Sequence, residues 1–438
     1  MSARRGGGTS GLSKRQVEPE PCFDSRLKKV GNQEKQNLLR LVVTKLLLIL
    51  FGLLFGCIVA EIALRVAGYS YPEFYQPDEA RGYALRPNME GWYRKEGAAY
   101  ISINSDGLRD REHQKAKPAD AIRIAVIGDS YPEALPVAIE HAFWSVLGRK
   151  LEQCGAFGSQ KIEVLNFGVS GYGTAQELIT LREHVWQYSP DVVMLAVTTN
   201  NDISDNLRAL KKTDEVPYFT YREGKLALDD SFRSTRAFRW RQSALSKLGR
   251  WMRDHSRLMQ AINQGHHGFK IWLAVRRART APPGQTETRT SAAASEELGI
   301  DNVIYREAGD QAWNDAWRVT EDLILQMRDE VKAKGARFVV VTLSNGIQVY
   351  PDPNVRQIFM KRVGVSDLFY PDNRIRKLCQ GAMIPVITLA PEMQAYAEQN
   401  KVFLHGFGSN LGNGHWNQLG QRVAGESIAK KLCEGLLK

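Results

Sequence analysis

Cysteine is scarce in this chain, with five residues among 438, and no two of them form a CxxC pair. No spacing of cysteine and histidine matches a structural zinc site. The GYG at 171–173 lacks the full GxGxxG spacing and a later ribose-binding acid, which argues against a nucleotide site. No internal repeat is visible. We therefore expect neither a metal nor an organic cofactor.

The shortage of cysteine also limits disulfides. Cys22 and Cys57 fall in a basic leader and in an apolar run, which leaves Cys154, Cys379 and Cys433. These three permit at most one disulfide and leave an odd thiol, and the sequence does not say which two pair.

Acidic residues are few near the N-terminus. Residues 1–45 contain ten Lys/Arg and four Asp/Glu, so this short stretch holds +6 of the net +11. Such a basic stretch before an apolar run is typical of a solvated tail ahead of a membrane span, and we favour this interpretation over nucleic-acid binding. No nucleic-acid partner is expected.

Polar residues are nearly absent from 41–60, which reads LVVTKLLLILFGLLFGCIVA and is long enough to cross a bilayer as a helix. A buried core helix is disfavoured because residues 46–60 have no polar face. A cleaved signal peptide is disfavoured because the leader is long and no clean cleavage site follows. The basic leader predicts a cytoplasmic N-terminus, with the rest outside the inner membrane, in the periplasm of a bacterium.

The chain divides by composition into four parts. Residues 1–40 read as a disordered cytoplasmic leader, 41–60 as the transmembrane helix, 61–120 as an aromatic, β-rich collar, and 121–438 as the main domain. A hydrophobic content of 43% allows that domain a sizeable core.

Short continuous apolar runs alternate with helical patterns in the main domain. Such runs suit strands that are buried on both faces, and the alternation predicts right-handed βαβ units. We therefore predict an α/β fold with a flavodoxin-like, doubly wound parallel sheet of about five strands and a site at the strands' carboxyl ends. The predicted strands are 122–127, 161–166, 191–197, 337–343 and 384–389.

An insertion at about 207–310 separates the third and fourth of these strands. Its helices are basic and aromatic, and they precede the low-complexity TETRTSAAASEE at 286–297. We favour a lid over the site. A surface for anionic lipid headgroups or an acidic polymer is the alternative.

Four short segments stand after predicted strands or near the chain end. Ser130 follows the first strand in Gly-Asp-Ser, where a strand-to-helix turn exposes a nucleophile. Gly171 follows the second strand and can bring its backbone N–H close to an oxyanion. Asn201 follows the third strand, and its amide can donate to the same oxyanion. His415 precedes the last helix and can reach the same sheet edge.

Each segment alone is equally compatible with a turn or a helix cap, but their order and placement together favour one site. GDSY, NFGVSGYGT, TNND and GHWN resemble the four blocks of SGNH/GDSL hydrolases over about 121–205 and 337–438. The resemblance implies that Ser130 is the nucleophile and His415 its base. It also implies that the oxyanion donors are the N–H groups of Ser130 and Gly171 and the side chain of Asn201. The span, the collar and SINSDGLRDRE at 102–112 resemble a membrane-tethered bacterial subgroup.

Two positions depart from the family pattern. Asn200 stands where the third block usually has glycine, which is mild because asparagine tolerates the left-handed conformation best. The triad acid usually lies three residues before the histidine, where this chain has Gly412 followed by Asn413. Either a Ser-His dyad works with a backbone carbonyl or Asn413 orienting the imidazole, or an acid comes from elsewhere.

These residues predict a serine hydrolase that cleaves acyl esters, short-chain ones by preference, with O-acyl groups on carbohydrate as candidate substrates. An O-acyltransferase acting on an exported polysaccharide would use the same residues. A non-catalytic polysaccharide-binding or assembly module is the other alternative, and the missing acid is its best support.

Overall fold

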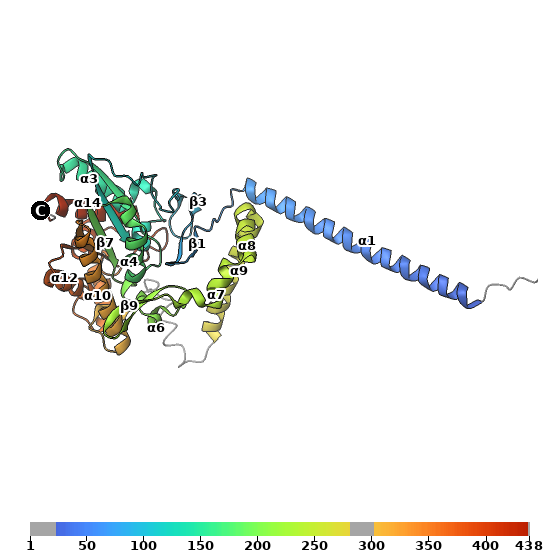
Figure 1. Ribbon diagram of the computed structural model, residues 1–438. Helices are drawn as coiled ribbons and strands as arrows, with labels where there is room; N and C mark the ends of the chain where they lie inside the picture. The colour runs from blue at the N-terminus through green and yellow to red at the C-terminus, as the bar shows by residue number, and fades with distance from the viewer. Residues whose placement is uncertain (1–22, 281–301, 437–438) are drawn as a thin grey trace, which may run out of the picture. The chain divides into compact units, whose positions relative to one another are not determined.

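The computed structural model describes residues 23–280 and 302–436, and the chain forms two compact units, Met1–Ala67 and Gly68–Lys438 (Figure 1). In the first unit, α1 runs over Phe23–Val66. Within its part Lys35–Val66, the most apolar window has a mean hydropathy of 2.7 and contains no buried residue. This part is therefore long and apolar enough to cross a membrane.

This helix begins earlier than the sequence indicated. Residues 23–40 were expected in a disordered leader, but they are helical. They contain no proline and are rich in Leu, Lys, Arg, Gln and Glu, which favour helix, so the apolar helix can continue backward into them. The remainder of the expected leader, residues 1–22, lies outside the described residues.

The second unit is built on a five-stranded parallel sheet, which confirms the predicted fold class. The strand order β11-β10-β7-β5-β6 is the flavodoxin-like order. Of these five strands β5 comes first in the sequence, and it lies between the second, β6, and the third, β7. The bounds are β5 Ala121–Gly128, β6 Lys161–Asn166, β7 Val192–Thr198, β10 Arg337–Leu343 and β11 Val386–Thr388.

Helices cover both faces of the sheet and close two apolar cores. One core gathers side chains of α4, α10 and α12, and the other gathers those of α3, α13 and α14. The major helices are α3 Phe143–Cys154, α4 Thr174–Glu183, α10 Gln311–Ala333, α11 Pro353–Val363, α12 Tyr370–Gly381, α13 Leu389–Asn400 and α14 Gln418–Cys433. The short helices α2 and α5, at Ser130–Glu133 and Asp202–Asp205, follow β5 and β7 directly. Helices α11 and α13 were not predicted from the sequence. Helix α13 begins directly after the short strand β11, within the apolar run 384–389 that was predicted as one strand.

From residue 68 onward the collar belongs to the same compact unit as the sheet, whereas residues 61–66 of the expected collar are the end of α1. The collar forms two antiparallel hairpins, and its apolar side chains pack on Val169 and Tyr172, which follow β6. The strands are β1 Tyr75–Asp78, β2 Gly82–Leu85, β3 Glu90–Tyr93 and β4 Ala99–Ser102.

The insertion contributes a hairpin and a run of helices. Tyr71 N donates to Gln260, and Arg86 pairs with Asp254 at 2.6 Å, so the insertion's helices are fastened to the collar. The elements are α6 Arg208–Lys211, β8 Tyr218–Arg222, β9 Lys225–Asp229, α7 Arg236–Gln242, α8 Ala244–His255 and α9 Arg257–Thr280. The low-complexity segment at 286–297 lies outside the described residues.

One disulfide joins Cys154 to Cys433, and Cys379 is a buried free thiol, so the expectation of one pair with one odd thiol is confirmed. The bridged residues end α3 and α14, which pack against each other, and the two Cα atoms are 6.3 Å apart. The bond therefore ties the C-terminal helix to the middle of the chain, across 279 residues of sequence.

We predict that replacing both bridged cysteines, as Cys154→Ser with Cys433→Ser, destabilises the protein by about 2–4 kcal/mol, because the cross-link restricts the unfolded chain. Thermal unfolding of the full chain in detergent, with and without dithiothreitol, measures this. The reductant should lower the midpoint of the wild type and leave the double variant unchanged. Equal sensitivity of both proteins to the reductant would contradict the assignment.

Candidate active site

Ser130 and His415 meet at the carboxyl end of the sheet. Ser130 opens α2 immediately after β5, and its Oγ lies 2.8 Å from Nε2 of His415, which sits two residues before the cap of α14. Both side chains are partly exposed. The pair is separated by 285 residues in sequence. This arrangement lets the imidazole accept the hydroxyl proton.

The second nitrogen of the same imidazole contacts a carboxylate from the collar. Glu96 lies in the turn between β3 and β4, with Oε2 2.5 Å from His415 Nδ1 and Oε1 accepting from the His415 backbone N–H at 2.8 Å. Gly414 makes this approach possible, because a Cβ there would lie 2.2 Å from Oε1 of Glu96. Serine, histidine and glutamate thus form a continuous hydrogen-bonded chain.

Glu96 was not found from the sequence, and the two positions examined for an orienting group do not fill its place. Gly412 has φ +88°, and a Cβ there would lie 2.6 Å from the Tyr350 ring, so no side chain fits where the family usually has its acid. Asn413 makes a backbone hydrogen bond to Asn410 instead, while Glu96 occupies Nδ1 of His415. A carboxylate in a hairpin turn 319 residues before the histidine carries no local signal.

The charges around His415 favour its protonated form. Burial opposes protonation, but the hydrogen bond to Glu96 and the negative charge of Glu96 outweigh burial, so the pKa of His415 lies above its usual value. In turn, burial alone would raise the pKa of Glu96, but the hydrogen bonds and charge of His415 lower it below its usual value. The imidazole therefore sits against an ionised carboxylate, which would stabilise an imidazolium.

The remaining predicted residues lie at the same sheet edge. Asn201 caps α5 and donates its amide to Asp129 at 3.2 Å. The fully buried Asp129 also accepts from Thr198 at 2.7 Å, and burial raises its pKa in spite of these bonds. Gly171 lies in the turn between β6 and α4, with its carbonyl held by Lys211. Asn200 has no positive φ, so the substitution for glycine imposes no strain.

A buried polar cluster fixes the loop that carries His415. His405 Nδ1 lies 2.7 Å from the Gly414 carbonyl, and its Nε2 lies 3.2 Å from Ser344 Oγ. Trp416 Nε1 donates to the same Ser344 oxygen at 2.9 Å. Burial lowers the pKa of His405 to about 4, so it stays neutral and serves as a fixed hydrogen-bonding link.

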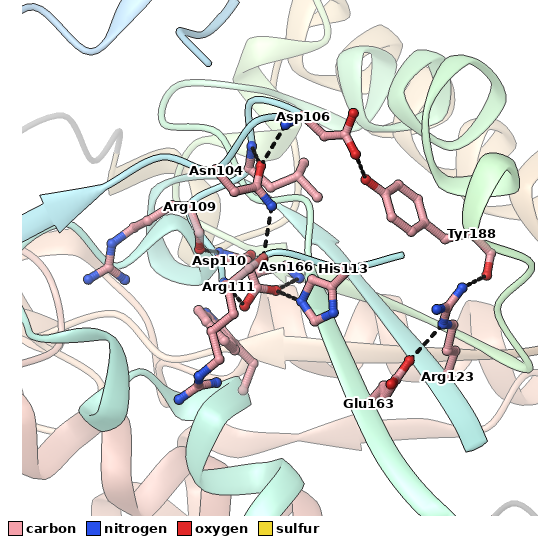
Figure 2. Close-up of polar contacts among 12 residues, drawn as sticks. Asn104, Asp106, Arg109, Asp110, Arg111, His113, Arg123, Glu163, Asn166 and Tyr188 are labelled. Carbon is pink, nitrogen blue, oxygen red and sulfur yellow. Dashed lines mark hydrogen bonds and ion pairs between the residues drawn. The ribbon is translucent and has the colours of Figure 1, made fainter. Parts of the chain in front are cut away.

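Residues of the collar segment 102–112 form hydrogen bonds with Asn166, the first residue of the segment NFGVSGYGT (Figure 2). Asp110 accepts from the Asn166 backbone N–H at 2.9 Å, and Asn166 donates its side-chain amide to the Arg109 carbonyl at 3.1 Å. The fully buried Arg109 donates to the carbonyl of Glu133, the last residue of α2, at 2.9 Å. One short segment therefore ties α2, which Ser130 opens, to the loop that contains Gly171.

Several carboxyl groups beneath the site are buried. Burial is the first cause of the strongly raised pKa values of Glu177 and Asp202. The second cause is repulsion from Asp129 for Glu177, and repulsion from Glu177 for Asp202. Glu133 has a pKa of about 8, raised by burial and only partly offset by hydrogen bonds from Tyr75 and Ser170. At neutral pH Glu133 therefore favours the protonated form, which limits the negative charge around Ser130.

No protein-family model matches the chain, and no curated protein matches it. Solved structures are similar to it at low identity. For an acetyl xylan esterase the identity is 14% and the TM-score 0.34, with 70% of this chain and 98% of that chain covered.

Two further structures give comparable values. For an acetylxylan esterase from Geobacillus stearothermophilus the identity is 10% and the TM-score 0.35, with 71% and 94% covered. For an alpha/beta hydrolase enzyme from the metagenome of Lake Arreo, Spain, the identity is 11% and the TM-score 0.35, with 72% of this chain and 96% of that chain covered. The chemistry of this chain therefore has to be argued from the site itself.

We predict that Glu96→Gln lowers the pKa of His415, because the neutral amide no longer stabilises the imidazolium while burial continues to oppose it. Histidine-selective isotope labelling and an NMR pH titration of the full chain would measure the change. Asn413→Ala is the matched control and should leave the pKa of His415 unchanged. A shift in the control that equals the shift in Glu96→Gln would refute the assignment.

Proposed function

We propose that this chain is a membrane-anchored serine esterase of the SGNH/GDSL type that removes short acyl groups from carbohydrate. The proposal assigns Ser130 as nucleophile, His415 as general base and Glu96 as the orienting acid. The observation that carries it is the hydrogen-bonded chain from Ser130 Oγ through both nitrogens of His415 to Glu96. Asn413 is not needed in this role.

The chemistry follows from that chain. His415 Nε2 takes the proton as Ser130 Oγ forms a bond to the acyl carbonyl carbon, and the carbonyl electron pair moves onto its oxygen. The tetrahedral intermediate collapses when the alcohol leaves with the proton that His415 returns. Water then repeats the sequence on the acyl-enzyme, releasing the acid. Glu96 keeps the imidazole oriented and offsets its positive charge at each step.

The same resemblance assigns the oxyanion donors. These are the N–H groups of Ser130 and Gly171 and the side-chain amide of Asn201, all of which follow strands at one sheet edge. Asn201 is held by Asp129, which supports a fixed donor direction. Preorganised donors of this kind stabilise the developing oxyanion without reorganisation.

The alternatives depend on what reaches the acyl-enzyme. A sugar hydroxyl in place of water would make the protein an O-acyltransferase. The case for a non-catalytic module rested on the missing acid, and the contact between Glu96 and His415 removes that reason. We therefore place the enzyme first.

We further propose that the N-terminus is cytoplasmic and that residues 68–438 lie in the periplasm. The basic leader supports this orientation. The disulfide between Cys154 and Cys433 supports an oxidising compartment.

We predict that Ser130→Ala abolishes covalent labelling by a fluorophosphonate and lowers the hydrolysis of 4-nitrophenyl acetate by at least about 10³-fold, because the attacking oxygen is gone. Intact-mass spectrometry of wild type and variant measures the labelling. The fold should persist, since a partly exposed hydroxyl contributes little to stability, and circular dichroism checks this. Equal labelling of both proteins, or a folded wild type with neither labelling nor activity, would favour the binding module.

For the orientation, alkaline phosphatase fused after residue 120 should be active in bacteria, because that enzyme needs the periplasm to form its disulfides. A reporter that works only in the cytoplasm, fused at the same position, should be inactive. The reverse pattern would show that the main unit lies inside the cell.

A further inference from the structure

A cavity of about 350 Å³ lies beside the candidate active site, between the collar and the helices of the insertion. We call it the arginine pocket. Its volume is at the low end for small-molecule sites. Its lining includes Tyr75 and Tyr83 of the collar, Ser170, and the insertion residues Arg241, Arg250 and Arg253.

The arginine pocket shares a wall with the loop that is assigned to the oxyanion. Ser170 lines the pocket and directly precedes Gly171. Tyr83, on the same wall, donates to the Ser170 carbonyl at 2.8 Å. Tyr75 donates to Glu133, three residues after Ser130, at 2.8 Å. The wall of the pocket is therefore bonded both to the loop that contains Gly171 and to the helix that Ser130 opens.

The positive charge in the arginine pocket exceeds the negative charge. Three of the surrounding arginines have carboxylate partners: Arg241 with Glu215 at 2.7 Å, Arg253 with Glu73 at 2.9 Å and Arg86 with Asp254 at 2.6 Å. The fourth, Arg250, donates to the Arg241 carbonyl and to Ser246 Oγ, and no carboxylate pairs with it within 23–280 and 302–436. One positive charge is thus uncompensated.

Two further facts point to an anionic ligand. Arg241 Nε is buried with no acceptor in the described part of the chain. Burial, together with repulsion from Arg86 and Arg253, outweighs the attraction of Glu73 and Asp254 and lowers the pKa of Arg250. An anionic ligand would relieve that repulsion, because a planar guanidinium can bind two oxygens of a carboxylate or a phosphate at once. On the carbohydrate substrate of the proposed function, the carboxylate of an acidic sugar would supply these two oxygens.

We propose that the arginine pocket binds the carboxylate of a uronic-acid residue, so that the substrate is an acylated acidic polysaccharide rather than a neutral one. This inference rests on the proposed function. It gives the insertion a task, because α7 and α8 supply all three pocket arginines. Binding energy from the carboxylate would hold the acylated sugar against Ser130.

The test uses the full chain in detergent and two matched substrates, an O-acetylated methyl glucuronoside and the corresponding O-acetylated methyl glucoside. They differ only in carrying a carboxylate or a hydroxymethyl group. Acetate release gives kcat/KM for wild type, Arg250→Gln, Arg250→Lys and Arg422→Gln. Arg422 is an exposed arginine outside the pocket and serves as the matched control.

We expect wild type to prefer the glucuronoside, and Arg250→Gln to lose about 10- to 100-fold in kcat/KM on that substrate alone, as loss of a charge-assisted hydrogen bond would produce. The loss should appear mainly in KM. Arg250→Lys should retain part of the preference, and Arg422→Gln all of it. Hydrolysis of 4-nitrophenyl acetate by Arg422→Gln should equal that of the wild type, and circular dichroism shows that all four proteins are folded.

Equal kcat/KM on both sugars in wild type, or a preference that survives Arg250→Gln, would overturn the proposal. So would weaker binding of Arg250→Gln to phosphatidylglycerol vesicles with unchanged sugar preference, which would make the pocket a headgroup site. Labelling of Ser130 by the fluorophosphonate distinguishes failure of the proposed function from failure of the pocket proposal. If wild type is not labelled, calorimetry with an oligoglucuronate decides whether the pocket binds it in an Arg250-dependent way, and absence of such binding refutes the pocket as well.

Discussion

The contact between Glu96 and His415 is the constraint on which the site depends. A carboxylate can reach Nδ1 of the imidazole only because residue 414 has no Cβ, and the same oxygen pair also accepts the backbone N–H of His415. Position 412, where the acid of the family usually stands, is closed by the Tyr350 ring. The carboxylate that contacts the imidazole therefore comes from a hairpin of the collar and not from the histidine's own loop.

Moving the acid to the collar makes the collar's position critical. A hydrogen bond needs its donor and acceptor within a narrow range of distance and angle, so the hairpin that carries Glu96 must be held in a fixed position relative to the sheet. The buried bonds from Asp110 and Arg109 to Asn166 and Glu133 meet this need, because they join the collar to the two segments that follow β5 and β6. The apolar packing of the collar on Val169 and Tyr172 excludes water from the same region.

Charge is distributed unevenly around Ser130. Beneath it, burial raises the pKa values of Glu133, Glu177 and Asp202, so negative charge is reduced there. Beside it, the helices of the insertion bring an excess of positive charge to the arginine pocket. The ionised Glu96 is the exception, and its charge is matched by His415 whenever the imidazole is protonated. Such an arrangement suits an anionic substrate and a developing oxyanion better than a cationic one.

The sequence by itself determined the sheet, the apolar helix and the four segments at one sheet edge. Continuous apolar runs report strands buried on both faces, and parallel strands bring their carboxyl ends together whatever the intervening loops contain. The expectation that His415 reaches the same sheet edge as Ser130 rested on that topology, while the 2.8 Å contact between them was decided by the tertiary structure. The pairing of Cys154 with Cys433, the approach of Glu96 and the gathering of Arg241, Arg250 and Arg253 were decided only by tertiary structure. Each joins residues with no shared periodicity or motif, and a hairpin turn or a surface helix carries no local pattern that says which distant group it will meet.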